Sequence, residues 1–193
     1  MMKVRKLVLL TLAFSLIFGS VAYAADSATQ KLRLWINKKS ESSGVVAVDN
    51  KTYISTDIVS DKLQAIVIKD DNKVVIYKPN VNMLTSKNDG SIFGDVPQGK
   101  KVKFNTFIQV DSLKVDISAL KLTIADPYGD ETLVETRKSG DDDFPDGKDN
   151  YWITMKDISY IFDSAGLYTL RFWMKPAGES SFQVVAEKTI TSK

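Results

Sequence analysis

Apolar and polar side chains alternate along most of the chain from residue 101 to residue 190. A period of two residues is typical of β-strands that bury one face. The clearest strands that this pattern predicts lie at residues 101–110, 120–124, 132–137, 151–155, 168–174 and 182–190. About seven short strands separated by turns indicate an antiparallel sandwich, which we expect at residues 91–193.

A short segment before one of these strands makes the expectation more specific. Residues 163–168 read Asp-Ser-Ala-Gly-Leu-Tyr. They resemble the corner before strand F of immunoglobulin-like domains, where a tyrosine ties the turn back to the backbone. The resemblance implies an Ig-like β-sandwich, here without a disulfide because the chain has no cysteine.

The first 24 residues have the three-part pattern of a secretory signal peptide. Lys3, Arg5 and Lys6 form a basic start, residues 7–22 carry no charge, and Ala22-Tyr23-Ala24 supplies small residues for cleavage. An uncleaved anchor is the alternative, but the uncharged run is shorter than the roughly 20 residues that span a bilayer. We expect cleavage after Ala24 and a secreted, extracellular protein, associated with the cell wall or free, that meets the membrane only during export.

The net charge of the chain and the distribution of its basic residues argue against nucleic-acid binding. Removing the leader changes the formal net charge from +2 to −1, because three basic groups and no acid leave with it. The remaining basic residues are scattered along the chain. They form no basic stripe with interleaved aromatic residues, which nucleic-acid binding usually requires.

Residues 31–79 are expected to form a small α+β module, which makes the expected fold class mainly β overall. The expected elements are a strand at 32–36, strands at 44–48 and 51–55, a helix at 57–63, and strands at 65–69 and 73–78. Ser55 or Thr56 is the expected N-cap of the helix. The polar segment 80–90 breaks both periods and predicts a linker before the sandwich.

Several segments of this block follow one another in a recognisable order. They are Leu34-Trp35-Ile36-Asn37-Lys38, Asp49-Asn50-Lys51-Thr52-Tyr53-Ile54, the helix from Asp57 to Leu63, and Lys73-Val74-Val75-Ile76. In order and spacing they resemble the copper amine oxidase N-terminal-like domain, also called the stalk domain, of secreted proteins of Gram-positive bacteria. Ser55, Gln64 and Ile68 stand where that family usually has proline, glycine and tryptophan. The resemblance implies an accessory, non-catalytic module.

The chain contains neither histidine nor cysteine. A Ser-His-Asp or Cys-His catalytic site therefore cannot form, and zinc or copper cannot be held by imidazole. Asp126, Asp130 and Glu131 share one turn, but no second carboxylate is seen to oppose them as paired-carboxylate hydrolysis requires. We expect no enzyme activity, with a carboxylate-based hydrolase as the remaining catalytic alternative.

Three tryptophans and one arginine are the candidate ligand-binding residues. By strand alternation, Trp35, Trp152 and Trp173 point away from the apolar face, and Arg171 shares the phase of Trp173. Exposed tryptophan is enriched at binding surfaces, and a flat ring suits the face of a sugar. In an Ig-like strand order, Trp152 and Trp173 fall on opposite sheets. The alternative is that interdomain packing or a bulge covers these rings.

The acidic segment 139–150 is a candidate calcium loop. Its candidate ligands are Asp141, Asp143, Asp146 and Asp149. Calcium takes about six to eight oxygen ligands, which such a loop could wrap around the ion. The closing glutamate of an EF-hand is missing, and a solvated acidic loop is the alternative. No other cofactor is expected.

These observations together favour binding over catalysis. We expect an exported, non-catalytic accessory protein that contacts a cell-wall polymer, a glycan or another exported protein. The alternative is a structural spacer, or a secreted inhibitor or chaperone, that acts by protein contact only.

Overall fold

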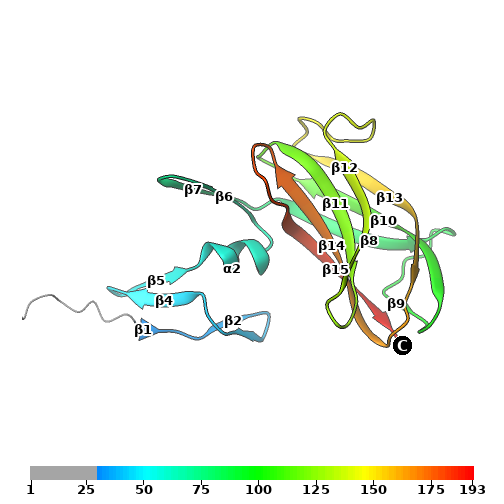
Figure 1. The fold of residues 1–193 in the computed structure, drawn as a ribbon, viewed down its shortest axis with the longest axis horizontal. Helices are drawn as coiled ribbons and strands as arrows, with labels where there is room; N and C mark the ends of the chain where they lie inside the picture. Colours follow the sequence, from blue (N-terminus) through cyan, green and yellow to red (C-terminus); the bar gives the residue numbers. More distant parts are fainter. Residues whose placement is uncertain (1–29) are drawn as a thin grey trace, which may run out of the picture. The chain divides into compact units, whose positions relative to one another are not determined.

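The computed structural model describes residues 30–193, so the expected signal peptide lies outside the described residues. The fold of this part is mainly β, built from several antiparallel sheets and a short helix (Figure 1). The chain divides into two compact units, with the boundary between Ile54 and Ser55. No helix within residues 30–193 is long and apolar enough to cross a membrane.

The described part of the first unit consists of short strands. They are β1 (Gln30–Lys31), β2 (Leu34–Ile36), β3 (Lys39–Glu41), β4 (Val45–Val48) and β5 (Lys51–Ile54). β1, β4 and β5 form one antiparallel sheet, and β2 pairs with β3. Asp49 and Asn50 connect β4 to β5 with φ angles of 49° and 59°. A two-residue hairpin turn of this type needs positive φ at both positions, which Asp and Asn tolerate.

The second unit begins with α2 (Thr56–Asp61), followed by the hairpin of β6 (Ile66–Asp70) and β7 (Lys73–Tyr77). Ser55 is the N-cap of α2, as predicted, and its side chain accepts a hydrogen bond from the Ile58 N–H. This bond satisfies one of the backbone donors left unpaired at a helix start. Gln64 then adopts a φ of 55°, a left-handed conformation that a helix cannot continue through.

The rest of the second unit is a sandwich of two sheets (Figure 1). Its strands are β8 (Asn80–Lys87), β9 (Asp95–Val96), β10 (Lys101–Asp111), β11 (Ile117–Ala125), β12 (Glu131–Lys138), β13 (Tyr151–Ile161), β14 (Gly166–Pro176) and β15 (Gln183–Ser192). One sheet has the order β13-β10-β8, and the other has the order β12-β11-β14-β15-β9. All pairings are antiparallel except that of β15 with β9.

Side chains from both sheets meet in one core. Phe104 and Ile108 of β10 and Leu170 and Phe172 of β14 are all fully buried in the same cluster. Their alternation along the strand is the alternation visible in the sequence. Burying such apolar surface, at roughly 25 cal/mol per Å², is the main term that stabilises a sandwich.

An aromatic group closes one part of this core. The ring of Phe162 lies 4.9 Å from that of Tyr168 and 5.0 Å from that of Tyr160, both in edge-to-face geometry. It also lies 6.4 Å from the ring of Phe104. Edge-to-face pairs at this spacing add stability beyond the area they bury.

The predicted tyrosine corner is present. The Ser164 backbone N–H donates a hydrogen bond to the Tyr168 Oη at 3.0 Å. Tyr168 itself is buried at the start of β14. Its hydroxyl therefore fixes the turn that leads into the strand, as the segment 163–168 predicted.

The segment expected to be a linker, residues 80–90, contains a strand. β8 pairs with β10 along its whole length, from Asn80 opposite Asp111 to Lys87 opposite Phe104. Thr85 is fully buried, and its hydroxyl donates to the Phe93 carbonyl oxygen at 2.6 Å. The strand looks polar in sequence because it is an edge strand with half of its side chains in solvent.

The boundary between the compact units falls after β5 instead of at residue 79. Ile66 is fully buried in the core of the sandwich. The Val67 N–H donates to the Gln183 Oε1 at 2.8 Å, and the Gln183 Nε2 donates to the Val67 carbonyl oxygen at 2.9 Å. One side-chain amide thus satisfies both backbone groups of Val67 and ties β6 to the start of β15.

Candidate functional site

The structure places the three candidate tryptophans in different settings. Trp35 lies on β2 in the first unit and is 60% exposed. Trp152 lies on β13 and is 72% exposed. Trp173 lies on β14, in the opposite sheet, and is partly buried. As predicted, Trp152 and Trp173 are on opposite sheets and do not share a surface.

Trp173 is held by neighbours on its own sheet. Its Nε1–H donates to the Thr123 Oγ1 at 2.9 Å. The ammonium group of Lys121 lies 4.4 Å from the Trp173 ring and 4.7 Å from the Phe182 ring. A cation at this distance is attracted to the face of the indole. The ring is therefore covered by structural contacts on a face where a ligand would have to displace Lys121.

Arg171 has its charge satisfied within the sheet. Its Nη1 bonds to Glu131, and its Nε donates to Glu187 Oε1 at 2.8 Å. Burial opposes the charged form, but the hydrogen bonds that Arg171 donates to these two carboxylates offset it and raise the pKa of Arg171 above its ordinary value. A ligand at this arginine would have to compete with two carboxylates.

The carboxylates of the acidic loop contact separate partners and do not converge on one point. The candidate calcium ligands are Asp141, Asp143, Asp146 and Asp149. Asp141 accepts from the last backbone N–H of β12, Asp146 accepts from the Ser139 hydroxyl, and Asp149 pairs with Lys114. Among residues 30–193, no group of three or more acidic side chains is placed to hold a metal ion. Calcium binding by this loop stays a prediction from the sequence.

Trp152 is part of a larger exposed surface on the outer face of β8, β10 and β13, which we call the Trp152 face. Two cross-strand rows of the register make it up: Asn82, Gln109 and Trp152 in one, and Leu84, Phe107 and Thr154 in the next. Leu84 is 38% exposed and Phe107 is 37% exposed. All six positions fall on the side of their strands that faces away from the core.

The register makes three of these side chains neighbours across the sheet, and we call them the apolar band. Leu84 lies directly opposite Phe107, and Phe107 is the diagonal neighbour of Trp152. Diagonal neighbours are about 7–8 Å apart, within reach of aromatic side chains. Two strand spacings of about 4.8 Å make the band about 10 Å long.

Sequence reasoning missed Phe107 and Leu84, although one signal pointed to Phe107. In β10 the polar Thr106 occupies an inward position and is fully buried, whereas the apolar Phe107 points outward. An apolar residue in the polar phase of a strand is the signal by which the sequence could have located this surface. Leu84 could not be found in this way, because the polar sequence of residues 80–90 predicts a linker there.

A pocket of about 190 Å³ adjoins Trp152 at the edge of the sheet. The other residues that line it are Arg137, Asp143, Ile153, Thr154 and Lys156. Arg137 reaches across from β12 and donates from Nη2 to the Thr154 carbonyl oxygen at 3.0 Å. Its Nε also donates to Glu135 at 2.6 Å. The arginine thus joins the edge strands of the two sheets beside the pocket.

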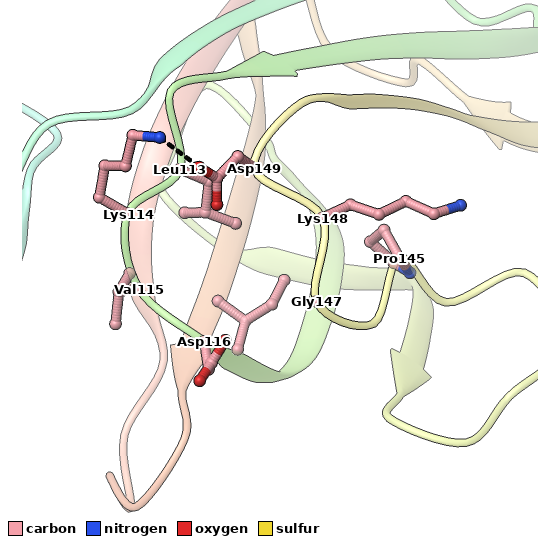
Figure 2. Close-up of a pocket in the computed structure, with 9 residues that line it drawn as sticks. Leu113, Lys114, Val115, Asp116, Pro145, Gly147, Lys148 and Asp149 are labelled. Carbon is pink, nitrogen blue, oxygen red and sulfur yellow. Dashed lines mark hydrogen bonds and ion pairs between the residues drawn. The ribbon is translucent and has the colours of Figure 1, made fainter.

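A second pocket, of about 230 Å³, lies between the loop after β10 and the loop before β13 (Figure 2). Lys114 and Asp149 form an ion pair at this pocket, and the side chain of Lys148 extends away from that pair (Figure 2). The Leu113 N–H donates to the Asp149 carbonyl oxygen at 2.9 Å, which joins the two loops. The charged groups around the pocket balance in sign, so they select neither an anion nor a cation.

Tyr151 is a buried polar residue near that end of the sandwich. Its hydroxyl has no hydrogen-bond partner among the described residues, and neither has the hydroxyl of Thr106. Burial raises the pKa of Tyr151 well above its ordinary value. Burial alone accounts for the shift.

Replacing Tyr151 with phenylalanine is expected to stabilise the fold by about 1 kcal/mol at neutral pH, because a buried hydroxyl without a partner opposes folding. The wild type should also lose stability as the pH rises above about 10, where an unfolded tyrosine loses its proton and the folded one keeps it. The substitution should reduce this loss. Burial raises the pKa of Tyr160 too, so part of the loss should remain. Urea unfolding at pH 7 and pH 10.5 measures both effects; a destabilised Tyr151→Phe variant would show that the hydroxyl has a partner.

Comparisons with known proteins add little to this geometry. No family model matches the chain, and no curated protein matches it. A Northeast Structural Genomics Consortium target, SoR45, aligns with a TM-score of 0.36 and 12% identity over 60% of this chain and 87% of its own. The C-terminal domain of wzt aligns with a TM-score of 0.38 and 10% identity over 69% of this chain and 81% of its own. Likenesses this distant support no conclusion about the chain.

Proposed function

We propose that this chain is an exported, non-catalytic binding protein whose ligand contacts the Trp152 face. The observation that carries the proposal is the exposure of Trp152, 72% of which is open to solvent at the end of an apolar band. Large aromatic side chains in water are enriched where a partner later covers them. The ligand would be a cell-wall polymer, a glycan or another exported protein.

The chemistry of β10 supports the same surface. Thr106 and Phe107 are adjacent, and the hydroxyl is buried without a partner while the aromatic ring is partly exposed. The opposite order would satisfy the hydroxyl with water and bury the ring. Places where a chain departs from the pattern that best stabilises it are expected at functional surfaces.

The strand order supports the Ig-like assignment of the sandwich. In Ig-like domains, strands A, B and E share one sheet, and strands G, F and C share the other, with C′ beside C in variable types. β8, β10 and β13 occupy the first set of places, and β15, β14, β11 and β12 occupy the second. Binding modules are often built on this scaffold, but the scaffold alone does not determine function.

The stalk-domain resemblance and the leader supply the proposed location. The order of two strands, a helix and two strands is present in β4, β5, α2, β6 and β7. Gln64, which stands where the stalk family usually has glycine, adopts the left-handed φ of 55° that glycine favours. With the signal-peptide pattern of residues 1–24, this supports an accessory protein of a Gram-positive cell surface, secreted or associated with the wall.

Replacing Trp152 with alanine should abolish most of the binding. Loss of an aromatic anchor reduces affinity by roughly thirtyfold when it contributes about 2 kcal/mol. Sedimentation of the mature protein with purified Gram-positive cell walls would measure this. Tyr128→Ala is the matched control, because Tyr128 is also highly exposed but lies in the turn between β11 and β12. Equal binding by the wild type and Trp152→Ala would remove the Trp152 face from the proposal.

Action by protein contact alone is the second candidate function, and two edge strands, β13 of the Trp152 face and β12 of the other sheet, favour it. β12 and β13 end their sheets, and a pocket of about 210 Å³ lies between residues 132–135 and 156–160 on these strands. An edge strand can pair with an added strand of a partner. A stoichiometric protein complex formed without any binding to walls would favour this inhibitor or chaperone function.

A further inference from the structure

We propose that the ligand of the Trp152 face is an uncharged, extended polysaccharide that lies along the apolar band. This inference rests on the proposed function and narrows its ligand to one class. It follows from how the chemistry of the face is distributed, since a sugar ring offers an apolar C–H face and a rim of hydroxyl groups.

The face itself bears no charge. Its two rows contain three apolar side chains, two amides and one hydroxyl, and none of the six is ionisable. Charged side chains lie outside the rows: Asp111 and Lys156 on the same strands, and Arg137 and Asp143 at the pocket that adjoins Trp152. An anionic polymer would be expected to meet lysine or arginine within the band, as charge matching requires. The face matches a neutral ligand.

The polar groups flank the band where sugar hydroxyls would lie. Gln109 donates from Nε2 to the Asp111 Oδ2 at 2.8 Å, which orients the amide and leaves its carbonyl oxygen as an acceptor. Among residues 30–193, neither the Asn82 amide nor the Trp152 Nε1–H has a hydrogen-bond partner within the chain. Uncharged donors and acceptors of this kind fix the orientation of a ligand without selecting a charge.

The shape of the band favours a chain of sugars over a single sugar or a folded protein. A band of about 10 Å across three strands is longer than one ring, so a single sugar would leave part of it exposed. A stable protein interface buries about 800 Å² on each partner and has a dry apolar centre. Three apolar side chains bordered by amides fit the narrower contact of an extended glycan.

One of the two cationic side chains that line the pocket beside Trp152 is already engaged. Arg137 donates one hydrogen bond to Glu135 and another to the Thr154 carbonyl oxygen. Lys156 is exposed on the same strand as Trp152, so it offers a direct test of charge. For a neutral ligand, removing its charge should leave the affinity unchanged.

The test is a titration of the mature protein with chitohexaose and cellohexaose, which are neutral, and with an oligogalacturonate of matched length, which is anionic. Tryptophan fluorescence and calorimetry should show saturable binding of a neutral oligosaccharide that added salt does not weaken. Trp152→Ala and Phe107→Ala should each lower the affinity at least tenfold. Lys156→Gln and Tyr128→Ala should leave it within twofold.

The outcomes separate the two proposals. Binding to cell walls that depends on Trp152, without binding of either neutral oligosaccharide, overturns the polysaccharide inference and leaves the proposed function intact. Preference for the oligogalacturonate, or loss of affinity in Lys156→Gln, also overturns it. Absence of any Trp152-dependent binding overturns both. A folded far-ultraviolet spectrum and unchanged urea midpoint in each variant exclude misfolding as the cause of a loss.

Discussion

Replacing Phe162 with alanine is expected to lower the free energy of unfolding of the unit formed by residues 55–193 by about 4 kcal/mol. Phe162 is fully buried, and its ring contacts those of Tyr160, Tyr168 and Phe104. The change removes apolar contact, leaves a cavity, and breaks the edge-to-face pairs that support the tyrosine corner. Because small domains are stable by only about 5–15 kcal/mol, the loss is a large fraction of the total.

Urea unfolding and thermal melting would measure this loss, and the melting temperature should fall by about 10 °C. Phe162→Leu fills much of the cavity, so its free energy of unfolding should fall by less than half as much. This variant keeps the prediction testable if Phe162→Ala does not fold. Leu133→Ala is the control, because Leu133 is exposed on β12 and its loss should change stability by under about 0.5 kcal/mol. A loss of less than 1.5 kcal/mol (about a third of that expected for a buried phenylalanine) in Phe162→Ala would contradict the packing described for this core.

Replacing Gln183 with alanine is expected to release β6 and β7 from the sandwich. The side chain of Gln183 makes two hydrogen bonds to the backbone of Val67, at 2.8 Å and 2.9 Å. Without it, a buried N–H and a buried carbonyl oxygen lose their partners, at about 1–3 kcal/mol for each group left unsatisfied. The local free energy of opening should fall by roughly 2–6 kcal/mol on this basis.

Hydrogen exchange would detect this release at the Val67 amide, whose protection should fall by a factor of about 30 or more. The amide of Phe104, in the middle of the other sheet, should keep its protection. Ser60→Ala is the matched control, because the Ser60 hydroxyl reaches the same Gln183 Oε1 at 3.4 Å and is exposed enough to find water. Unchanged protection at Val67 in Gln183→Ala would mean that Ile66 alone holds the hairpin in place.

The sequence was sufficient to predict most strands of the sandwich, because their periods of two were long and unbroken. The six predicted strands correspond to β10 to β15. The cap at Ser55 and the corner at Tyr168 were also predictable. Each depends on residues close together in the sequence, so local chemistry alone sets them.

The elements that were missed depend on contacts between distant parts of the chain. β8 carries amides on its outer face, so its sequence predicts a linker, yet its pairing with β10 completes the sheet. The helical module was placed with the preceding strands, although Gln183 binds Val67 across 116 residues of sequence. The neighbours of Trp152 could not be predicted for the same reason, since Leu84 and Phe107 join it only through the register of three strands.

The position of β15 has a consequence for how the chain folds. This strand pairs with β14 and β9, and its first residue binds β6. The Gln98 N–H also donates to the carbonyl oxygen of Lys193, just past the strand. Contacts between such distant residues close slowly, because the loop between them must be ordered first. We therefore expect the pairing of β15 to be a late step in folding, because it brings together segments from both ends of the unit formed by residues 55–193.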